Sequence, residues 1–97
     1  MSPRENIISI LRSLKPELIT RYGVKSLGLF GSVTRDDFRP DKSDVDIIVD
    51  FSKPVGVEFI DLAEFLERKI HRKIDLVSRR GIKTGYLKLI EPEIIYV

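Results

Sequence analysis

The segment from Asp44 to Phe51 most constrains how this chain can fold. Two sets of residues alternate in it: Val45, Ile47, Val49 and Phe51 in one, and Asp44, Asp46, Ile48 and Asp50 in the other. A period of two predicts a β-strand, whose two sets of side chains face opposite sides of a sheet. Asp44 and Asp46 then project from the same face, with Cα atoms roughly 6–7 Å apart. Asp50 continues this face, and we expect it in water at the exit of the strand.

The carboxylates of Asp44 and Asp46 are costly to hold side by side among apolar neighbours. Like charges about 4 Å apart repel by roughly 4 kcal/mol even at an effective dielectric constant near 20. A divalent cation removes this penalty, and Mg²⁺ prefers carboxylate oxygens together with phosphate oxygens. Asp75 is a third acid, in the apolar segment 73–78, and it joins the same site if the two strands are neighbours. The competing interpretations are a solvated strand face for the first two acids and a buried ion pair for Asp75.

Gly31 and Ser32 directly follow an apolar run, at a predicted strand-to-helix turn. Glycine at such a point lets an anion approach the backbone, the following N–H groups face that anion, and the serine hydroxyl adds a donor. Arg35 has two interpretations: its forked guanidinium binds a phosphate, or it forms a surface ion pair with Asp36 or Asp37. With the acids, these residues supply an anion cradle, metal ligands and a base, which phosphoryl-type transfer needs. A purely structural turn is the competing interpretation for Gly31 and Ser32.

The rest of the pattern predicts an α+β domain. Residues Ser2 to Glu5 are typical of a helix start with a capping box, and we expect Pro16 to break or kink that helix. The expected elements are helical pieces up to residue 14 and over 17–22, a strand over 24–30, a short helix or turn over 33–38, a strand over 45–51, a helix over 59–70, a strand over 73–78, a helix over 82–90 and a short strand over 94–97. A small mixed β-sheet with helices packed against it fits this order best. The link between the first two strands is short, which favours an antiparallel pair.

Composition narrows the class of protein. The 97 residues predict a single domain, 1–97, and 42% hydrophobic with 33% charged residues is typical of a soluble globular chain. The net charge of +2 gives no indication of a nucleic-acid partner. The absence of cysteine excludes disulfides and thiolate metal sites. No apolar stretch is long enough to span a bilayer, and the first residues lack the apolar region of a signal peptide, so we expect a cytoplasmic protein with no membrane partner.

Two motifs carry a resemblance to a known family: Gly31-Ser32-Val33-Thr34-Arg35, and Ser43-Asp44-Val45-Asp46-Ile47-Ile48-Val49. In this order they resemble the signature of the polymerase-β-type nucleotidyltransferase superfamily. More narrowly, nearly the whole chain resembles the minimal nucleotidyltransferase (MNT) antitoxins, which are paired with HEPN-domain toxins. The resemblance implies the minimal nucleotidyltransferase fold, with Asp44, Asp46 and Asp75 as ligands of one or two Mg²⁺ ions. It also implies that Gly31 and Ser32 hold the triphosphate of ATP and that Asp75 helps to deprotonate the attacking hydroxyl.

The activity implied by this resemblance is the transfer of AMP from ATP to a hydroxyl, with release of pyrophosphate. The expected acceptor is a tyrosine of a HEPN ribonuclease toxin, which the modification neutralises. A short chain without a separate acceptor-recognition domain favours a protein acceptor that supplies its own docking surface, and the analogy makes a hetero-oligomer with the toxin plausible. Two alternatives stay open: an antitoxin that acts by binding alone, and a nucleotidyltransferase that acts on RNA or a small molecule.

Overall fold

The computed structural model describes residues 2–35 and 38–97. Its helices are α1 (Pro3–Tyr22), α2 (Glu58–Ile70), α3 (Thr84–Ile90) and two short 3₁₀ helices, η1 (Gly31–Thr34) and η2 (Glu91–Glu93). Its strands are β1 (Val24–Phe30), β2 (Val45–Phe51), β3 (Ile74–Ser78) and β4 (Ile95–Tyr96). The predicted strands and the two later helices agree with these bounds to within two residues. The helix or turn expected over 33–38 corresponds in part to η1, and its positions 36 and 37 lie outside the described residues.

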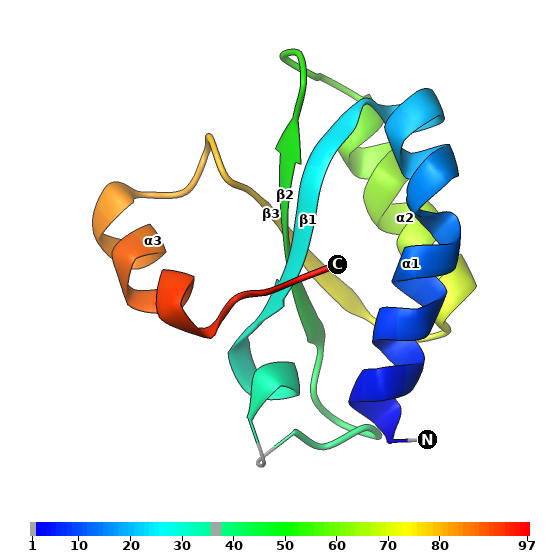
Figure 1. The fold of residues 1–97 in the computed structure, drawn as a ribbon, viewed down its shortest axis with the longest axis vertical. Coiled ribbons are helices and arrows are strands. Elements are labelled where there is room, and N and C mark those ends of the chain that lie inside the picture. The colour runs from blue at the N-terminus through cyan, green and yellow to red at the C-terminus, as the bar shows by residue number, and fades with distance from the viewer. Residues whose placement is uncertain (1, 36–37) are drawn as a thin grey trace.

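The strands form one mixed sheet in the order β3-β2-β1-β4. β1 pairs antiparallel with both β2 and β4, which confirms the antiparallel prediction for the first two strands. β2 and β3 are parallel and are connected through α2. Figure 1 shows α1 and α2 on one face of the sheet and α3 on the other. The predicted mixed sheet with packed helices is therefore confirmed.

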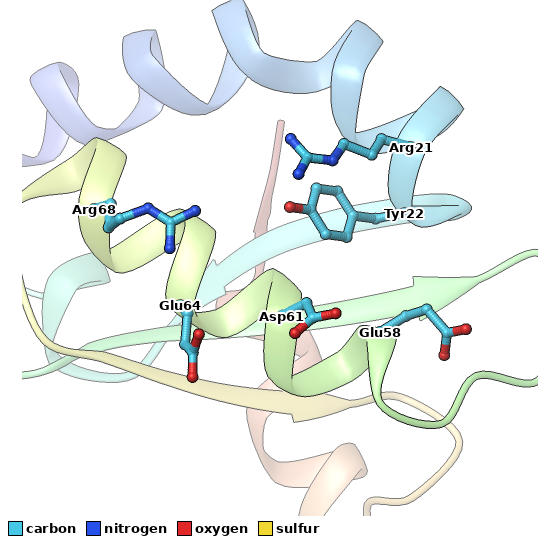
Figure 2. Close-up of a pocket in the computed structure, with 6 residues that line it drawn as sticks. All are labelled: Arg21, Tyr22, Glu58, Asp61, Glu64 and Arg68. Atoms are coloured by element: carbon cyan, nitrogen blue, oxygen red, sulfur yellow. The ribbon is translucent and has the colours of Figure 1, made fainter.

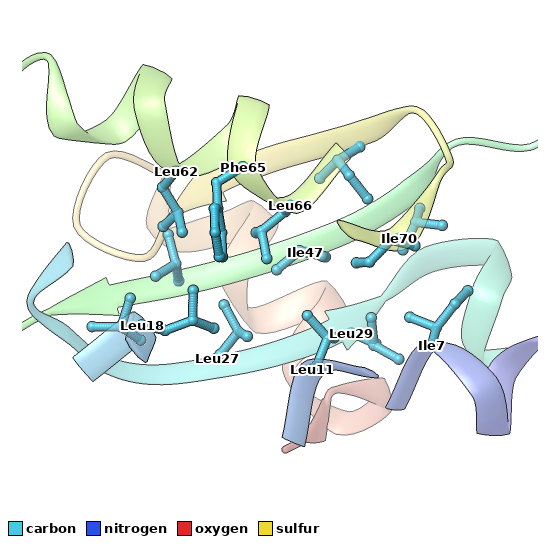
Figure 3. Close-up of a cluster of buried hydrophobic side chains, with 14 of the residues drawn as sticks. Ile7, Leu11, Leu18, Leu27, Leu29, Ile47, Leu62, Phe65, Leu66 and Ile70 are labelled. Carbon is cyan, nitrogen blue, oxygen red and sulfur yellow. The ribbon is translucent and has the colours of Figure 1, made fainter. Parts of the chain in front are cut away.

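The main core fills the space between the sheet and the pair α1 and α2 (Figure 3). Its fully buried side chains come from both helices, from the two central strands and from η1: Ile7, Leu11, Leu18, Leu27, Leu29, Val33, Val45, Ile47, Val49, Leu62 and Leu66. Each such aliphatic side chain stabilises the fold by about 1.5–3 kcal/mol relative to an exposed one. This face of β2 is the apolar set of the alternating segment, as the period of two predicts.

The prediction that Pro16 breaks or kinks the first helix is wrong, because α1 continues through it to Tyr22. Pro16 is exposed, so the backbone carbonyl that lacks its usual N–H donor lies on the solvent side, where water can bind it. Leu11 and Leu18 lie two turns apart on either side of the proline and are both fully buried. Their packing against the sheet holds the helix together across a position that propensity alone disfavours.

The second face of the sheet carries a smaller apolar cluster beneath α3. Phe30, Ile48 and Ile90 are its buried members. Alternate residues of a strand share a face, so Asp46 and Asp50 flank Ile48 on this side of β2. The acids therefore lie on the α3 face of the sheet, away from the main core. No helix within the described residues is long and apolar enough to cross a membrane.

Candidate active site

Two of the predicted acids lie side by side on neighbouring strands. Asp46 of β2 is the register partner of Asp75 of β3 in the parallel pair, so both side chains project from the α3 face. Asp44 lies immediately before β2. The condition set for Asp75, that its strand neighbours the strand of Asp46, is met. Asp75 is exposed, so the alternative of a buried ion pair does not apply to it.

Asp46 has the most perturbed carboxyl of this site. Burial, and then the neighbouring carboxyls of Asp75 and Asp44, together raise the pKa of Asp46 from 3.8 to about 6, while the positive charge of Arg35 works in the opposite direction. Asp46 therefore lies close enough to both Asp75 and Asp44 for their charges to disfavour its ionised form. Such a shift, produced by burial together with named charge partners, is a recognised mark of functional sites.

The three acids do not form a ready-made metal site in the described residues. Across residues 2–35 and 38–97, no group of three or more His, Cys, Asp or Glu side chains is arranged to hold a metal ion. Asp44 and Asp75 are exposed, so their side chains have room to adjust around an ion beside Asp46. Three carboxylates are the hard oxygen ligands that Mg²⁺ prefers, and a cation there would relieve the repulsion at Asp46. The donor set fits Mg²⁺ in its chemistry.

Gly31 places the backbone of η1 directly against the carboxyl of Asp46. The register of β1 and β2 pairs Phe30 with Asp46, and the next residue, Gly31, has φ +73°, in the left-handed region. A Cβ atom at Gly31 would lie 2.1 Å from Oδ2 of Asp46, so no other residue fits without displacing the acid. Ser32 follows in η1, is partly exposed, and its carbonyl accepts a hydrogen bond from the Arg35 N–H at 3.0 Å.

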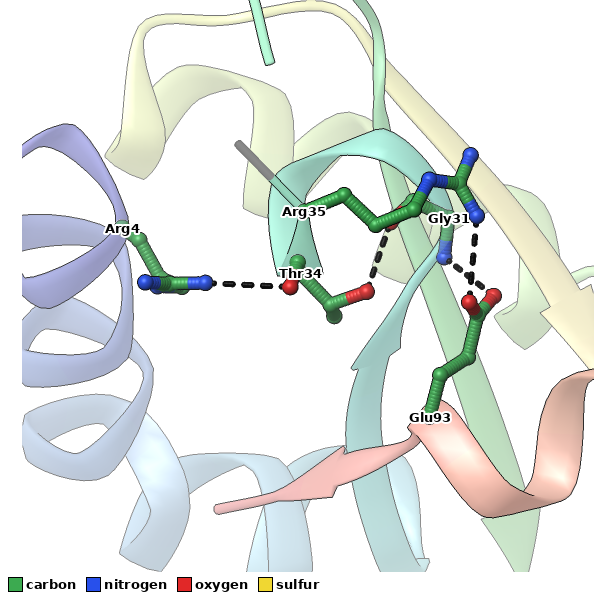
Figure 4. A network of polar contacts seen from close by, with 5 residues as sticks. All are labelled: Arg4, Gly31, Thr34, Arg35 and Glu93. Atoms are coloured by element: carbon green, nitrogen blue, oxygen red, sulfur yellow. Dashed lines mark hydrogen bonds and ion pairs between the residues drawn. The ribbon is translucent and has the colours of Figure 1, made fainter. Parts of the chain in front are cut away.

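Sequence reasoning missed two residues that hold η1 in place. The Thr34 hydroxyl donates to the carbonyl of Gly31 at 2.7 Å, and the Arg4 guanidinium donates to the carbonyl of Thr34 at 3.1 Å. Figure 4 shows these contacts between α1 and the turn. They fix the turn beside Asp46 from the side of the first helix. Thr34 lies within the motif quoted above, whereas nothing in the sequence near Arg4 indicates its contact.

Glu93 of η2 is a third residue that sequence reasoning missed. Its carboxylate accepts a hydrogen bond from the Gly31 N–H at Oε1 (3.0 Å) and one from Arg35 at Oε2 (3.0 Å) (Figure 4). Arg35 thus forms an ion pair, with Glu93, whereas Asp36 and Asp37 lie outside the described residues. Arg35, a donor that the sequence predicts for a phosphate, is thus bound to a carboxylate from the far end of the chain, together with the Gly31 N–H.

The prediction that Asp50 lies in water at the exit of its strand is wrong. Its side chain is only 16% exposed, and its Oδ1 atom lies 3.5 Å from Nε of Arg80. The chain after β3 continues beside β2, since the Arg79 N–H donates to the carbonyl of Val49 at 2.8 Å, and this brings Arg80 over the end of the strand. Asp50 therefore faces a cation, whereas Asp46 faces other acids. The alternating pattern of the sequence does not distinguish these two aspartates, but their surroundings in the structure do.

A polar hollow on the opposite face of the sheet is unrelated to these acids. It lies between the end of α1 and the helix α2 (Figure 2), and it is lined by Arg21, Tyr22, Glu58, Asp61, Glu64 and Arg68. Arg21 is already engaged there, with Glu17 at 3.0 Å and with its guanidinium 5.2 Å from the centre of the Tyr22 ring. We assign no catalytic role to this hollow.

A mixed sheet that presents paired acids beside a glycine turn defines the class of nucleotidyltransferase domains. The family model for the nucleotidyltransferase domain matches residues 11–97, and the chain belongs to this family. Over 94 residues the chain is 44% identical to the protein adenylyltransferase MntA of Thermococcus cleftensis, covering 96% of this chain and 94% of that protein. The family predicted from the two motifs is therefore confirmed.

Solved structures confirm the fold. The chain is similar to a chain of a toxin–antitoxin complex crystallised with AMP-PNP, with a TM-score of 0.69, 23% identity, and coverage of 96% of this chain and 70% of that one. It is also similar to a chain of the complex between a tri-AMPylated Shewanella oneidensis HEPN toxin and its MNT antitoxin. The TM-score there is 0.61 at 22% identity, with 97% and 67% covered. The predicted minimal nucleotidyltransferase fold is the fold observed.

Proposed function

We propose that this protein, as a single domain over 1–97, is a Mg²⁺-dependent protein adenylyltransferase. It transfers AMP from ATP to a tyrosine hydroxyl of a HEPN-domain toxin and thereby acts as an antitoxin. The observation that carries the proposal is the contact between the Gly31 backbone and Asp46, next to Asp75 on the neighbouring strand. It places a turn suited to an anion beside acids suited to a cation, which is what the transfer of a nucleotide requires.

The similar proteins support a protein as the acceptor and ATP as the nucleotide. The relative at 44% identity is named as a protein adenylyltransferase, which acts on protein rather than on RNA or a small molecule. One structural neighbour was crystallised with AMP-PNP, an ATP analogue, and another is a complex with an AMPylated HEPN toxin. We extend these properties to this chain because its whole domain matches theirs in fold and because its own acids and glycine turn suit the same chemistry.

The proposed reaction is a displacement at the α-phosphorus of ATP. The oxygen of the acceptor hydroxyl forms a bond to that phosphorus, the bond from the phosphorus to the oxygen bridging to the β-phosphate breaks, and pyrophosphate leaves. Asp44 and Asp46 would hold Mg²⁺, which supplies charge neutralisation for the triphosphate and the leaving group when bound. Asp75 would accept the proton of the hydroxyl. Its exposed position allows an incoming protein segment to reach it.

The turn would bind the triphosphate. The close approach of Gly31 to Asp46 would keep bound phosphates near the proposed metal ligands. Ser32 would donate its hydroxyl to a phosphate oxygen, and Arg35 would contribute charge at the open side of the turn. Because phosphoryl-type transfer depends mainly on positioning and on charge stabilisation, a domain of this size has sufficient groups for it.

The test is the mass of the toxin. The pure protein is incubated with a HEPN toxin, ATP and Mg²⁺, and the intact mass of the toxin is measured. We expect the toxin to gain AMP, the double variant Asp44→Asn/Asp46→Asn to add none, and the matched variant Asp50→Asn, on the same face of the same strand, to retain transfer. An unmodified but inhibited toxin would identify an antitoxin that acts by binding, and label from ATP in RNA would identify an RNA-directed enzyme. Either result refutes the proposal.

A further inference from the structure

The carboxylate of Glu93 is placed as a phosphate would be. It spans the turn, with one oxygen 3.0 Å from the Gly31 nitrogen and the other 3.0 Å from Nη1 of Arg35. A backbone N–H and a guanidinium are the donors that commonly bind phosphate oxygens in proteins. The fold thus supplies an anion of its own to the cradle that is proposed to bind the triphosphate.

We propose that Glu93 is an internal competitor of the triphosphate: it occupies the Gly31–Arg35 cradle in the free protein and must leave it before the phosphates of ATP can bind. This inference rests on the proposed function, because it concerns the same cradle. It deepens that proposal by identifying a residue, outside both sequence motifs, that sets the affinity for the nucleotide and for the pyrophosphate product.

The competition follows from the number of donors and from charge. The Gly31 backbone offers a single N–H, and at 3.0 Å from Glu93 it is already in use. A triphosphate placed there beside the carboxylate would add repulsion between like charges at short distance. The phosphate and Glu93 therefore exclude each other at this position.

Release of Glu93 requires only a small movement. Its side chain is 28% exposed and that of Arg35 is 53% exposed, so neither is locked in the core. Glu93 is the last residue of η2, which has only three residues. A change of side-chain rotamer would move the carboxylate into water without disturbing α3 or β4. The cost of this opening lowers the apparent affinity for ATP, since only the open fraction of the protein is competent to bind it.

The same contact would assist the end of the reaction. Once AMP has been transferred, pyrophosphate remains in the cradle, where the returning carboxylate of Glu93 competes with it. As pyrophosphate leaves, the carboxylate of Glu93 takes its place on the donors of the turn. The Gly31 N–H is then never left without an acceptor, which would be unfavourable. Glu93 would thus weaken the binding of the substrate and of the product through one contact.

The experiment compares Glu93→Gln with Glu91→Gln by calorimetric titration with Mg²⁺-ATP analogue, with inorganic tripolyphosphate and with adenosine. Glu91 is a matched control, because it lies in the same 3₁₀ helix and also pairs with an arginine, Arg79, at 2.9 Å. We expect Glu93→Gln to bind the analogue and tripolyphosphate about 3- to 10-fold more tightly than the wild type, as the loss of one partly exposed charged contact allows. Adenosine binding and the Glu91→Gln variant should not change.

Other outcomes overturn the inference. Unchanged or weaker binding of tripolyphosphate by Glu93→Gln would mean that Glu93 shapes the turn rather than competes for it. Glu93→Asp, which keeps the charge on a shorter side chain, gives a second measurement if the glutamine variant is unstable, and we expect it to fall between wild type and Glu93→Gln. Inhibition of AMP transfer by pyrophosphate should strengthen by the same factor as the binding. If the wild type transfers AMP but the variants bind no more tightly, only this inference fails, whereas absence of transfer by the wild type refutes the proposed function.

Discussion

Replacing Asp46 by asparagine should stabilise the metal-free protein. In the wild type, burial and the neighbouring acids raise the pKa of Asp46 to about 6. The unfolded chain releases this proton near its usual value of 3.8. Between these values the folded state binds more protons than the unfolded state, so the free energy of unfolding falls as the pH rises through this range. Above it, the folded protein carries the full penalty of a charged Asp46, which asparagine removes.

The size of this stabilisation follows from the shift in the pKa of Asp46. A rise in pKa from 3.8 to about 6 corresponds to about 3 kcal/mol between the two protonation states of a fully shielded group. Asp46 is only half-buried, and solvent screening reduces this to about 1.5 kcal/mol. For a domain of this size, that is a rise of roughly 6–12 °C in Tm for Asp46→Asn at about pH 8. At about pH 4 the wild-type carboxyl in the folded protein is neutral, and the two proteins should be nearly equal.

Thermal melts in EDTA across this pH range measure the difference in Tm between Asp46→Asn and the wild type. Asp50→Asn is the matched control: it lies on the same face of β2, but its carboxylate faces Arg80 at 3.5 Å, so we expect no gain in Tm. Adding Mg²⁺ and a non-hydrolysable ATP analogue should raise the Tm of the wild type and leave Asp46→Asn unchanged. An Asp46→Asn protein that is less stable than the wild type at about pH 8, or equally stabilised by the ligands, would contradict the electrostatic account of the site.

Three further substitutions test the structural basis of the site. Gly31→Ala should lower stability by about 1–3 kcal/mol in urea unfolding and abolish binding of the ATP analogue, because its Cβ would lie 2.1 Å from Asp46 Oδ2; normal binding would refute the close approach. Pro16→Ala should raise stability by about 1–3 kcal/mol in the same assay by restoring a helical hydrogen bond, and a loss would show that the proline has a structural role. Leu11→Ala should cost about 2–5 kcal/mol, since the side chain is fully buried, and a cost near zero would place α1 away from the sheet.

The strands could be predicted well from the sequence, because their signals are local. Alternation in the segment 44–51 fixed both the strand and the face of its acids. The neighbouring position of Asp75 was only conditional, since pairing between strands depends on how α2 packs and not on residues 73–78 alone. Pro16 is the opposite case. Proline is a strong local indication of a helix break, but the burial of Leu11 and Leu18 on either side of it keeps the helix continuous.

The residues that sequence reasoning missed act across long distances in the chain. Glu93 binds a residue 62 positions away, and Arg4 one 30 positions away. Neither has a local motif, and both became apparent only when the elements were placed in space. The difference between Asp46 and Asp50 has the same origin, because the path of the chain after β3 decides that only Asp50 meets Arg80.

The most direct test of the central claim is a crystal structure with Mn²⁺, which scatters anomalously and binds oxygen ligands as Mg²⁺ does, and a non-hydrolysable ATP analogue. We expect an anomalous peak within bonding distance of the carboxylates of Asp44, Asp46 and Asp75, and the triphosphate on the turn at Gly31 and Ser32. A cation bound elsewhere, or a nucleotide seated away from this turn, would contradict the account.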